Sequence, residues 1–138
     1  IKYLKMAVFT KLLKEDIENF ISEYSIGNLE NFEEIIEGIE NSNFKIFCNN
    51  KPYILTILEK RVADEDLPFF INLKNFLNKN NFKCPKAISD KNGKILKRIK
   101  NKTAFIISFL DGKSIAKPNL TMCKEVGKMI ANLHNLTL

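Results

Sequence analysis

Hydrophobic residues recur at helical spacing in three segments of the chain. Residues 14–24 place apolar side chains at positions i, i+3, i+4 and i+7, which predicts an amphipathic helix. A second helix is predicted over residues 65–78, where Pro68 falls in the first turn and is tolerated there. A third helix is predicted over residues 119–136, and its apolar face is broad: Met122, Val126, Met129, Ile130 and Leu133.

Between these helices, shorter apolar runs predict six strands, over residues 32–37, 44–48, 53–58, 86–89, 94–99 and 103–110. The turn sequences Asn49–Pro52 and Asp90–Gly93 each join two of these runs, which predicts two hairpins. The run 103–110 is almost continuously apolar, which is typical of a strand buried on both faces. Helix, three strands, helix, three strands and helix predict an α+β fold with a mostly antiparallel sheet.

Composition narrows the class of protein. With 138 residues, 45% of them hydrophobic and 28% charged, the chain has the balance of one globular domain. No uninterrupted apolar run is long enough to cross a membrane, and no secretory signal is apparent, so we expect no membrane partner. Three distant cysteines, Cys48, Cys84 and Cys123, with His134 as the sole histidine, disfavour a zinc site and a disulfide framework. Such isolated cysteines suit a cytoplasmic protein.

Charge is distributed unevenly along the chain. Residues 1–70 carry a net charge of −5 and residues 71–138 one of +11, with the basic excess densest from Lys74 to Lys102. One interpretation is a phosphate-rich partner such as a nucleotide or RNA. The alternative is an ordinary solvated lysine surface. We favour the second, because only Arg61 and Arg98 are arginines, and arginine is the residue that nucleic-acid readers prefer.

Two segments are candidates for binding chemistry. The loop Gly38–Phe44 is rich in Gly, Asn and Ser, so its backbone N–H groups and the Ser42 hydroxyl could face a phosphate, although an ordinary turn has the same composition. The strand from Phe105 leads to Asp111-Gly112 and could expose backbone groups to a flat base, although a core strand and a turn would look alike. His134 is interpreted as structural, and no paired-carboxylate, triad or metal arrangement occurs.

Several short motifs follow one another in a specific order: Met6–Leu12, Gly38–Phe44, Tyr53–Thr56, Glu59–Val62, Glu65–Phe70, Cys84-Pro85, Ser108–Gly112 and Leu133-His134. This succession resembles the bacterial homoserine kinases of the aminoglycoside-phosphotransferase-like type. The resemblance implies a protein-kinase-like fold, with residues 6–107 as the amino-terminal lobe, residues 108–113 as the hinge and residues 114–138 as the start of a truncated carboxy-terminal lobe. Residues 1–5 would then be upstream or added residues.

The resemblance also implies ATP- and Mg²⁺-dependent phosphoryl transfer to the hydroxyl of L-homoserine, in threonine biosynthesis. It assigns phosphate binding to Gly38, Asn41, Ser42 and Asn43, and adenine binding to Ile46, Ile54, Ser108, Phe109 and Leu110. Thr56 occupies the position where many relatives carry a strand lysine, and its spacing from Ile54 places both on one side of the strand. The catalytic and magnesium-binding residues of this fold are expected beyond Leu138, so none is assigned here and the chain is expected to be inactive alone.

Two alternatives stay open at this point. The first is another small-molecule kinase of the same fold, acting on choline, methylthioribose or an aminoglycoside, because substrate choice is set mostly outside these residues. The second belongs to a different class, a basic RNA-binding module that would use residues 74–102. It lacks the combination of strand-borne aromatic residues and arginines that such modules use.

Overall fold

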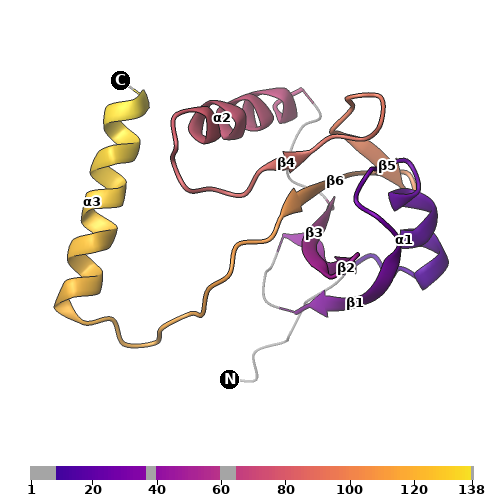
Figure 1. The fold of residues 1–138 in the computed structure, drawn as a ribbon, viewed down its shortest axis with the longest axis horizontal. Coiled ribbons are helices and arrows are strands. Elements are labelled where there is room, and N and C mark those ends of the chain that lie inside the picture. The colour runs from indigo at the N-terminus through magenta and orange to yellow at the C-terminus, as the bar shows by residue number, and fades with distance from the viewer. Residues whose placement is uncertain (1–8, 37–39, 60–64, 138) are drawn as a thin grey trace.

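The computed structural model describes residues 9–36, 40–59 and 65–137 (Figure 1). Three helices and six strands follow in the order α1 (Lys14–Ile21), β1 (Leu29–Ile35), β2 (Asn41–Cys48), β3 (Lys51–Leu58), α2 (Leu67–Lys79), β4 (Ala87–Ile88), β5 (Lys97–Ile99), β6 (Lys102–Ser108) and α3 (Leu120–Thr137). Every strand pair is antiparallel. The predicted α+β class and the predicted order of elements are therefore confirmed.

The strands form one sheet in the order β1-β2-β3-β6-β4, and β5 also pairs with β6. The predicted turn between β2 and β3 is a two-residue loop in which Asn49 and Asn50 both have positive φ, 49° and 60°. Such a loop matches the right-handed twist of the strands it joins. A second loop of this kind, at Lys100 and Asn101, joins β5 to β6 and was not predicted.

The predicted hairpin over residues 86–99 is wrong, because β4 and β5 do not pair with each other. Both pair with β6, where Ala87 lies opposite Ile107 and Lys97 lies opposite Ala104. The Asp90 carboxylate accepts the backbone N–H groups of Asn92 and Lys94, at 2.9 and 2.8 Å. In addition, the N–H of Lys91 donates to the carbonyl of Glu23 at 2.9 Å. These bonds hold the loop against the end of α1 instead of continuing a strand ladder.

The two faces of the sheet have different surroundings. One face, which we call the core face, packs against α1 and carries fully buried residues of β2, β3 and β6: Ser42, Phe44, Ile46, Leu55, Ile57, Ala104 and Ile106. Residues of the opposite parity form the open face, which is mostly half-buried. Phe105 and Ile107 lie on it, so β6 is not buried on both faces as predicted.

A polar network closes one end of the core face. The Ser42 hydroxyl accepts the backbone N–H groups of Phe9 and Thr10, at 2.9 and 3.0 Å, and donates to the Glu59 carboxylate. Glu59 also accepts from Lys102, whose ammonium contacts the Thr10 hydroxyl at 2.7 Å. The Glu59 side chain is only 4% exposed, so these partners replace the water it loses. The network joins the segment before α1 to β2, β3 and β6.

The charge imbalance between the two halves of the sequence is partly neutralised by ion pairs between them. Lys100 pairs with Asp16 at 2.8 Å, and Lys97 pairs with Glu23, while Lys102 reaches Glu59. Part of the basic excess therefore forms ion pairs that join the two halves of the sequence, which the interpretation of a solvated lysine surface does not include.

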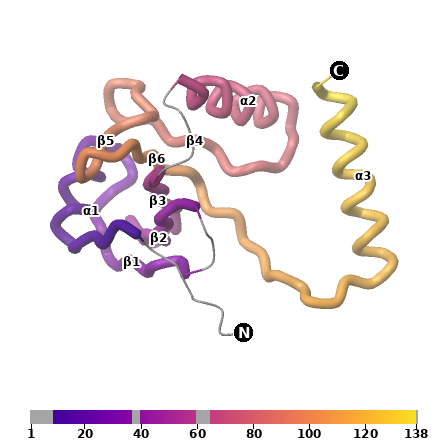
Figure 2. Tube along the Cα trace, turned by 180° about the vertical axis from the view of Figure 1, so that it is seen from behind, coloured from indigo at the N-terminus to yellow at the C-terminus, as the bar shows by residue number. Residues whose placement is uncertain are grey.

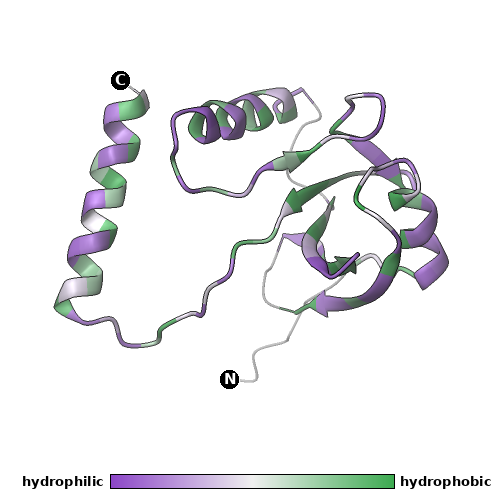
Figure 3. Ribbon diagram, viewed as in Figure 1, coloured by the Kyte–Doolittle hydropathy of each residue, from purple (hydrophilic) through white to green (hydrophobic). Residues whose placement is uncertain are grey.

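Residues 111–119 lead away from the sheet to α3, which stands apart from α2 and the sheet in both views (Figures 1 and 2). No residue of α3 is buried, and apolar positions recur along it (Figure 3). Its largest exposed hydrophobic residues are Leu120, Met122, Val126, Met129 and Ile130. None of the described helices is long and apolar enough to cross a membrane.

Substitution of Gly27 should destabilise the fold, because both its positive φ and the lack of room for a Cβ atom require glycine. Its φ is +95°, and a Cβ atom there would lie 2.3 Å from Cγ of Asn49, whose Oδ1 accepts the N–H of Asn28 at 3.2 Å. We expect Gly27→Ala to lower the free energy of unfolding by about 2–4 kcal/mol, from left-handed strain and loss of that bond. Gly93, with φ +82° and no atom within 4 Å, is the matched control, and Gly93→Ala should cost about 1 kcal/mol. Urea denaturation of both variants measures this, and equal losses would contradict the steric argument.

The charge of Glu59 should make stability depend on pH. Burial alone would raise the pKa of this carboxyl, but hydrogen bonds from Lys102, Ser42 and Thr10 outweigh burial, so its pKa lies below the ordinary 4.5. A depressed pKa stabilises the fold above the unfolded value, and this contribution is lost as pH falls below about 4.5. We expect Glu59→Gln to cost about 1–2 kcal/mol at pH 7 and progressively less below pH 4.5, measured by denaturation at several pH values.

Glu18→Gln provides the control for that experiment, because Glu18 pairs with Lys14 at 3.5 Å at an exposed site, where solvent screens the charges. A deficit of Glu59→Gln that stayed constant down to pH 3 would contradict the role given to the carboxylate charge.

Candidate functional site

Two neighbouring strands, β2 and β3, place four of the predicted site residues on the open face: Asn41, Asn43, Ile54 and Thr56. Across β2, β3 and β6, Lys45 lies opposite Ile54 and Ile54 opposite Ile107, and we call this row the isoleucine rung. The next row, the threonine rung, consists of Asn43, Thr56 and Phe105. Ile54 and Thr56 share a face, as their spacing predicts. The two rungs are about 7 Å apart, the length of two strand residues.

Ile46, like Ser42, lies on the core face, and its assignment to a base is corrected. It is fully buried on the core face with Phe44, whereas Ile54 lies on the open face. Side chains on opposite faces of a strand pair cannot contact the same base. The sequence pattern contains the reason, because Phe44, Ile46 and Cys48 form one continuous apolar row that the core requires.

The predicted phosphate residues differ in what their side chains do. The Ser42 hydroxyl is buried in the polar network of the core face, and Ser42 lies opposite Ile57 in the β2–β3 ladder, so its side chain is not available to a ligand. Asn41 and Asn43 are half-buried at the start of β2, and both have open-face parity. Gly38 lies outside the described residues.

The threonine rung contains a side-chain hydrogen bond. Thr56 Oγ1 donates to Asn43 Oδ1 at 2.8 Å, and Asn43 Nδ2 lies 3.5 Å from the carbonyl oxygen of Asn41. Thr56 is 6% exposed. The bond therefore holds one end of the Asn43 amide in place where the strand meets the loop.

The hinge segment begins where β6 ends. The N–H of Ser108 donates to the carbonyl of Lys86 at 2.8 Å, and Ser108 Oγ accepts the N–H of Lys86 at 2.9 Å, which fixes this point of the chain. Phe109 follows, and the Lys45 ammonium lies 4.2 Å from the centre of its ring. Leu110 is 40% exposed, and in the described part of the chain its backbone makes no hydrogen bond. Its N–H and C=O are available to a ligand.

Lys45 is a residue that sequence analysis did not single out. Its ammonium also lies 5.0 Å from the centre of the Phe47 ring, so it links β2 to the hinge segment. Each such cation–π contact contributes about 0.5–1 kcal/mol at an exposed site. The alternation along β2 could have identified it, because Lys45 is two residues from Asn43 and therefore on the same face.

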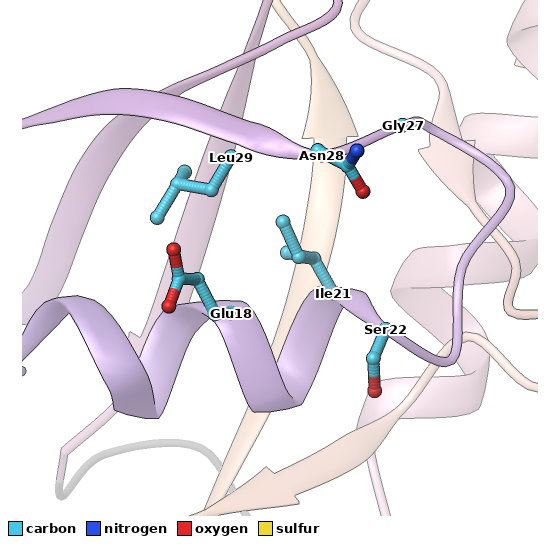
Figure 4. Close-up of a pocket in the computed structure, with 6 residues that line it drawn as sticks. All are labelled: Glu18, Ile21, Ser22, Gly27, Asn28 and Leu29. Atoms are coloured by element: carbon cyan, nitrogen blue, oxygen red, sulfur yellow. The ribbon is translucent and has the colours of Figure 1, made fainter.

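Helix α2 borders the open face, with its first half near Leu58 and Phe105 and its last turns near Lys86 and Ala87. A cavity of about 230 Å³ separates the helix from the sheet, and it is lined by Leu58, Leu67, Phe70, Ile71, Lys74, Leu96 and Phe105. Another cavity of about 230 Å³ lies between α1 and the start of β1 (Figure 4), lined by Glu18, Ile21, Ser22, Gly27, Asn28 and Leu29. The second cavity contains none of the predicted site residues.

The described residues contain no preformed cluster of metal ligands: no group of three or more His, Cys, Asp or Glu side chains in residues 9–36, 40–59 and 65–137 is placed to hold an ion. Mg²⁺ in kinase sites is held by one or two carboxylates together with substrate phosphates. Neither rung contains a carboxylate, so the two rungs do not supply a Mg²⁺ ligand. The described residues present a half-buried apolar surface at Ile54 and Ile107, with the unpaired backbone of Leu110 beside it. The amide side chain of Asn43 lies one rung away.

Comparison with known proteins identifies the family of this chain. The family model described as "Phosphotransferase enzyme family" matches residues 31–137. The homoserine kinase of Agrobacterium fabrum is 40% identical over 129 residues, and that of Parvibaculum lavamentivorans is 42% identical over 129 residues. Each match covers 94% of this chain and 40% of the relative, so the chain spans two fifths of the length of these relatives.

Solved structures share the fold at low sequence identity. A spectinomycin phosphotransferase, in complex with ADP and spectinomycin, superposes with a TM-score of 0.72 at 13% identity, over 94% of this chain and 40% of that chain. A putative aminoglycoside phosphotransferase from Ralstonia eutropha gives 0.53 at 15% identity, over 76% and 30%. Since the family model covers well over half of the chain and the protein-kinase-like fold agrees, the chain belongs to the phosphotransferase enzyme family.

Proposed function

We propose that this chain is the nucleotide-binding part of an ATP-dependent homoserine kinase. The main support for the proposal is the open face. There the isoleucine and threonine rungs lie beside the backbone N–H and C=O of Leu110, which make no hydrogen bond in the described part of the chain. Homoserine is proposed as the acceptor of the phosphoryl group because the relatives named above are homoserine kinases, at 40–42% identity. Phosphorylation of L-homoserine would place the protein in threonine biosynthesis, and we expect it in the cytoplasm.

The nucleotide would lie along the open face with its base at the isoleucine rung. Ile54 and Ile107 offer apolar contact to one side of the adenine, and Phe109 stands beside it. The edge of the base would pair with the carbonyl of Ser108 and the backbone of Leu110. Sites of this kind combine apolar walls with a few directed polar groups.

The phosphates would then extend toward the threonine rung and the loop before β2. There Asn41, Asn43 and Gly38 would contact them, while the Ser42 side chain stays in its structural network. Phosphoryl transfer relies on positioning and charge stabilisation rather than on covalent chemistry by the protein. The contribution of this chain is to bind and orient ATP, and no step is assigned to Mg²⁺ on these residues.

The catalytic base and the magnesium ligands would come from the carboxy-terminal lobe that the relatives carry in addition. We expect that lobe to cover the apolar positions of α3, since a face of this size is unusual on the surface of a complete domain. In this arrangement residues 6–107 form the amino-terminal lobe, residues 108–113 the hinge and residues 114–138 the first part of the second lobe.

An RNA-binding function is less well supported. Three lysines of the basic segment, Lys97, Lys100 and Lys102, form ion pairs with acidic residues of this same chain. Ion-paired lysines release fewer counterions on binding a phosphate backbone, which weakens the main driving force for nucleic-acid binding.

Nucleotide binding can be mapped directly on the ¹⁵N-labelled chain. On titration with ADP, we expect the largest amide shifts at residues 41–45, 54–56 and 107–110, because the ligand would lie against them. Ile54→Gln should weaken binding about fivefold or more by placing an amide against the base, whereas Phe69→Gln, at an exposed site on α2, should not. Shifts confined to other elements, or RNA binding that falls steeply with salt, would contradict the proposal.

Activity requires a second experiment with the missing lobe supplied. The chain joined to the carboxy-terminal lobe of the Agrobacterium fabrum homoserine kinase should release ADP in the presence of L-homoserine, while the chain alone should show no turnover. Choline, methylthioribose and an aminoglycoside serve as comparison acceptors with that lobe. Turnover by the chain alone would refute the assignment of the catalytic residues to the second lobe.

A further inference from the structure

The threonine rung raises a question about how the phosphates are held. Thr56 stands where the resemblance places a lysine in many relatives, and no lysine or arginine belongs to this rung. The four buried polar residues in the described part of the chain are Thr10, Ser42, Thr56 and Asp90. Among them, Thr56 alone lies on the open face, and its partner is the side chain of Asn43.

We propose that Thr56 and Asn43 act together in place of the strand lysine, with Asn43 Nδ2 donating to a phosphate oxygen of the nucleotide. This inference rests on the proposed nucleotide binding. Because Thr56 Oγ1 donates to Asn43 Oδ1 at 2.8 Å, the acceptor end of the amide is occupied by the strand. The donor end is then the part left for a ligand, and an amide NH₂ carries two hydrogens. Thr56 is a positioning residue, and Asn43 is the contact residue.

The second hydrogen bond of the Asn43 amide, from Nδ2 to the carbonyl oxygen of Asn41, is weak, so Nδ2 can still donate to a ligand. Asn43 Nδ2 lies 3.5 Å from the carbonyl oxygen of Asn41, at the limit for a hydrogen bond. A phosphate oxygen is a stronger acceptor because it is charged, and charge-assisted bonds are shorter and about twice as strong as neutral ones. Exchange of this partner for a phosphate would therefore be favourable.

Lys45 is the competing candidate, because it is the nearest strand cation on the open face. Its ammonium lies 4.2 Å from the Phe109 ring centre and 5.0 Å from that of Phe47, so it is directed to the hinge end of the face. Lys45 also belongs to the isoleucine rung, about 7 Å from Asn43 along the strand. Its position suits the base more than the phosphates.

The test compares ADP with adenosine, which share the base and differ in the phosphates. Thr56→Val removes only the hydroxyl and suits a strand. We expect it to weaken ADP binding to the chain about tenfold and to leave adenosine binding within about twofold. Thr56→Ser keeps the hydroxyl and should retain ADP affinity, a rescue that a purely packing role of the methyl group would not give.

Asn43→Asp tests the contact residue itself. It preserves the shape of the side chain but replaces the donor by a negative oxygen, so ADP should weaken about thirtyfold or more while adenosine stays unchanged. Amide shift titrations give both dissociation constants, and thermal unfolding checks that each variant is folded.

Several outcomes would overturn the inference. Equal weakening of ADP and adenosine by Thr56→Val would indicate a merely structural role. A selective loss of ADP binding in Lys45→Met, with Thr56→Val unchanged, would assign the phosphates to the cation. If neither ligand binds the unsubstituted chain, the proposed function fails together with this inference, whereas the first two outcomes overturn the inference alone.

Discussion

The strict alternation of side chains along β2, β3 and β6 is the constraint on which the rest of the structure depends. Phe44, Leu55 and Ile106 are fully buried under α1, and a one-residue slip of any strand would move its apolar set into solvent. Full burial of each such side chain contributes about 1.5–3 kcal/mol, so the register is strongly specified. The same register aligns Asn43 with Thr56 and Lys45 with Ile54 on the other face. The energetics of the core thereby determine the geometry of the candidate site.

Electrostatic complementarity adds a second level of order. The amino-terminal half of the sequence is acidic and the second half basic, and the fold brings them together through pairs such as Lys100 with Asp16 and Lys102 with Glu59. The buried Glu59 is the most demanding of these groups, because an ion without partners would be costly in the interior. Its partner Ser42 belongs to the strand that carries Asn41 and Asn43. The network thus anchors the start of β2 from the side opposite to the proposed phosphates.

Most of the fold could be predicted from periodicity, and the errors have physical causes. The apolar patterns of α1, α2 and the central strands match positions that are buried in the fold, whereas α3 follows such a pattern with none of its residues buried. The hairpin over residues 86–99 was wrong because the Asp90 side chain competes with strand pairing, which an apolar pattern does not report. Ile46 was assigned to the base because residue type alone does not tell one face of a strand from the other. Lys45 was overlooked because its role depends on Phe109, more than sixty residues away in sequence.

If the proposed function holds, the residues of the open face determine which part of phosphoryl transfer this chain would contribute. A strand lysine would supply a charge, whereas in the proposed arrangement Asn43 would supply a neutral hydrogen-bond donor that Thr56 holds in position. In the proposed enzyme, the charge that phosphoryl transfer must neutralise would be met by the carboxy-terminal lobe. A lobe that orients the nucleotide without neutralising it would bind ATP with little dependence on salt. It would contribute to the rate mainly by alignment, and the second lobe would supply the electrostatic stabilisation of the transition state.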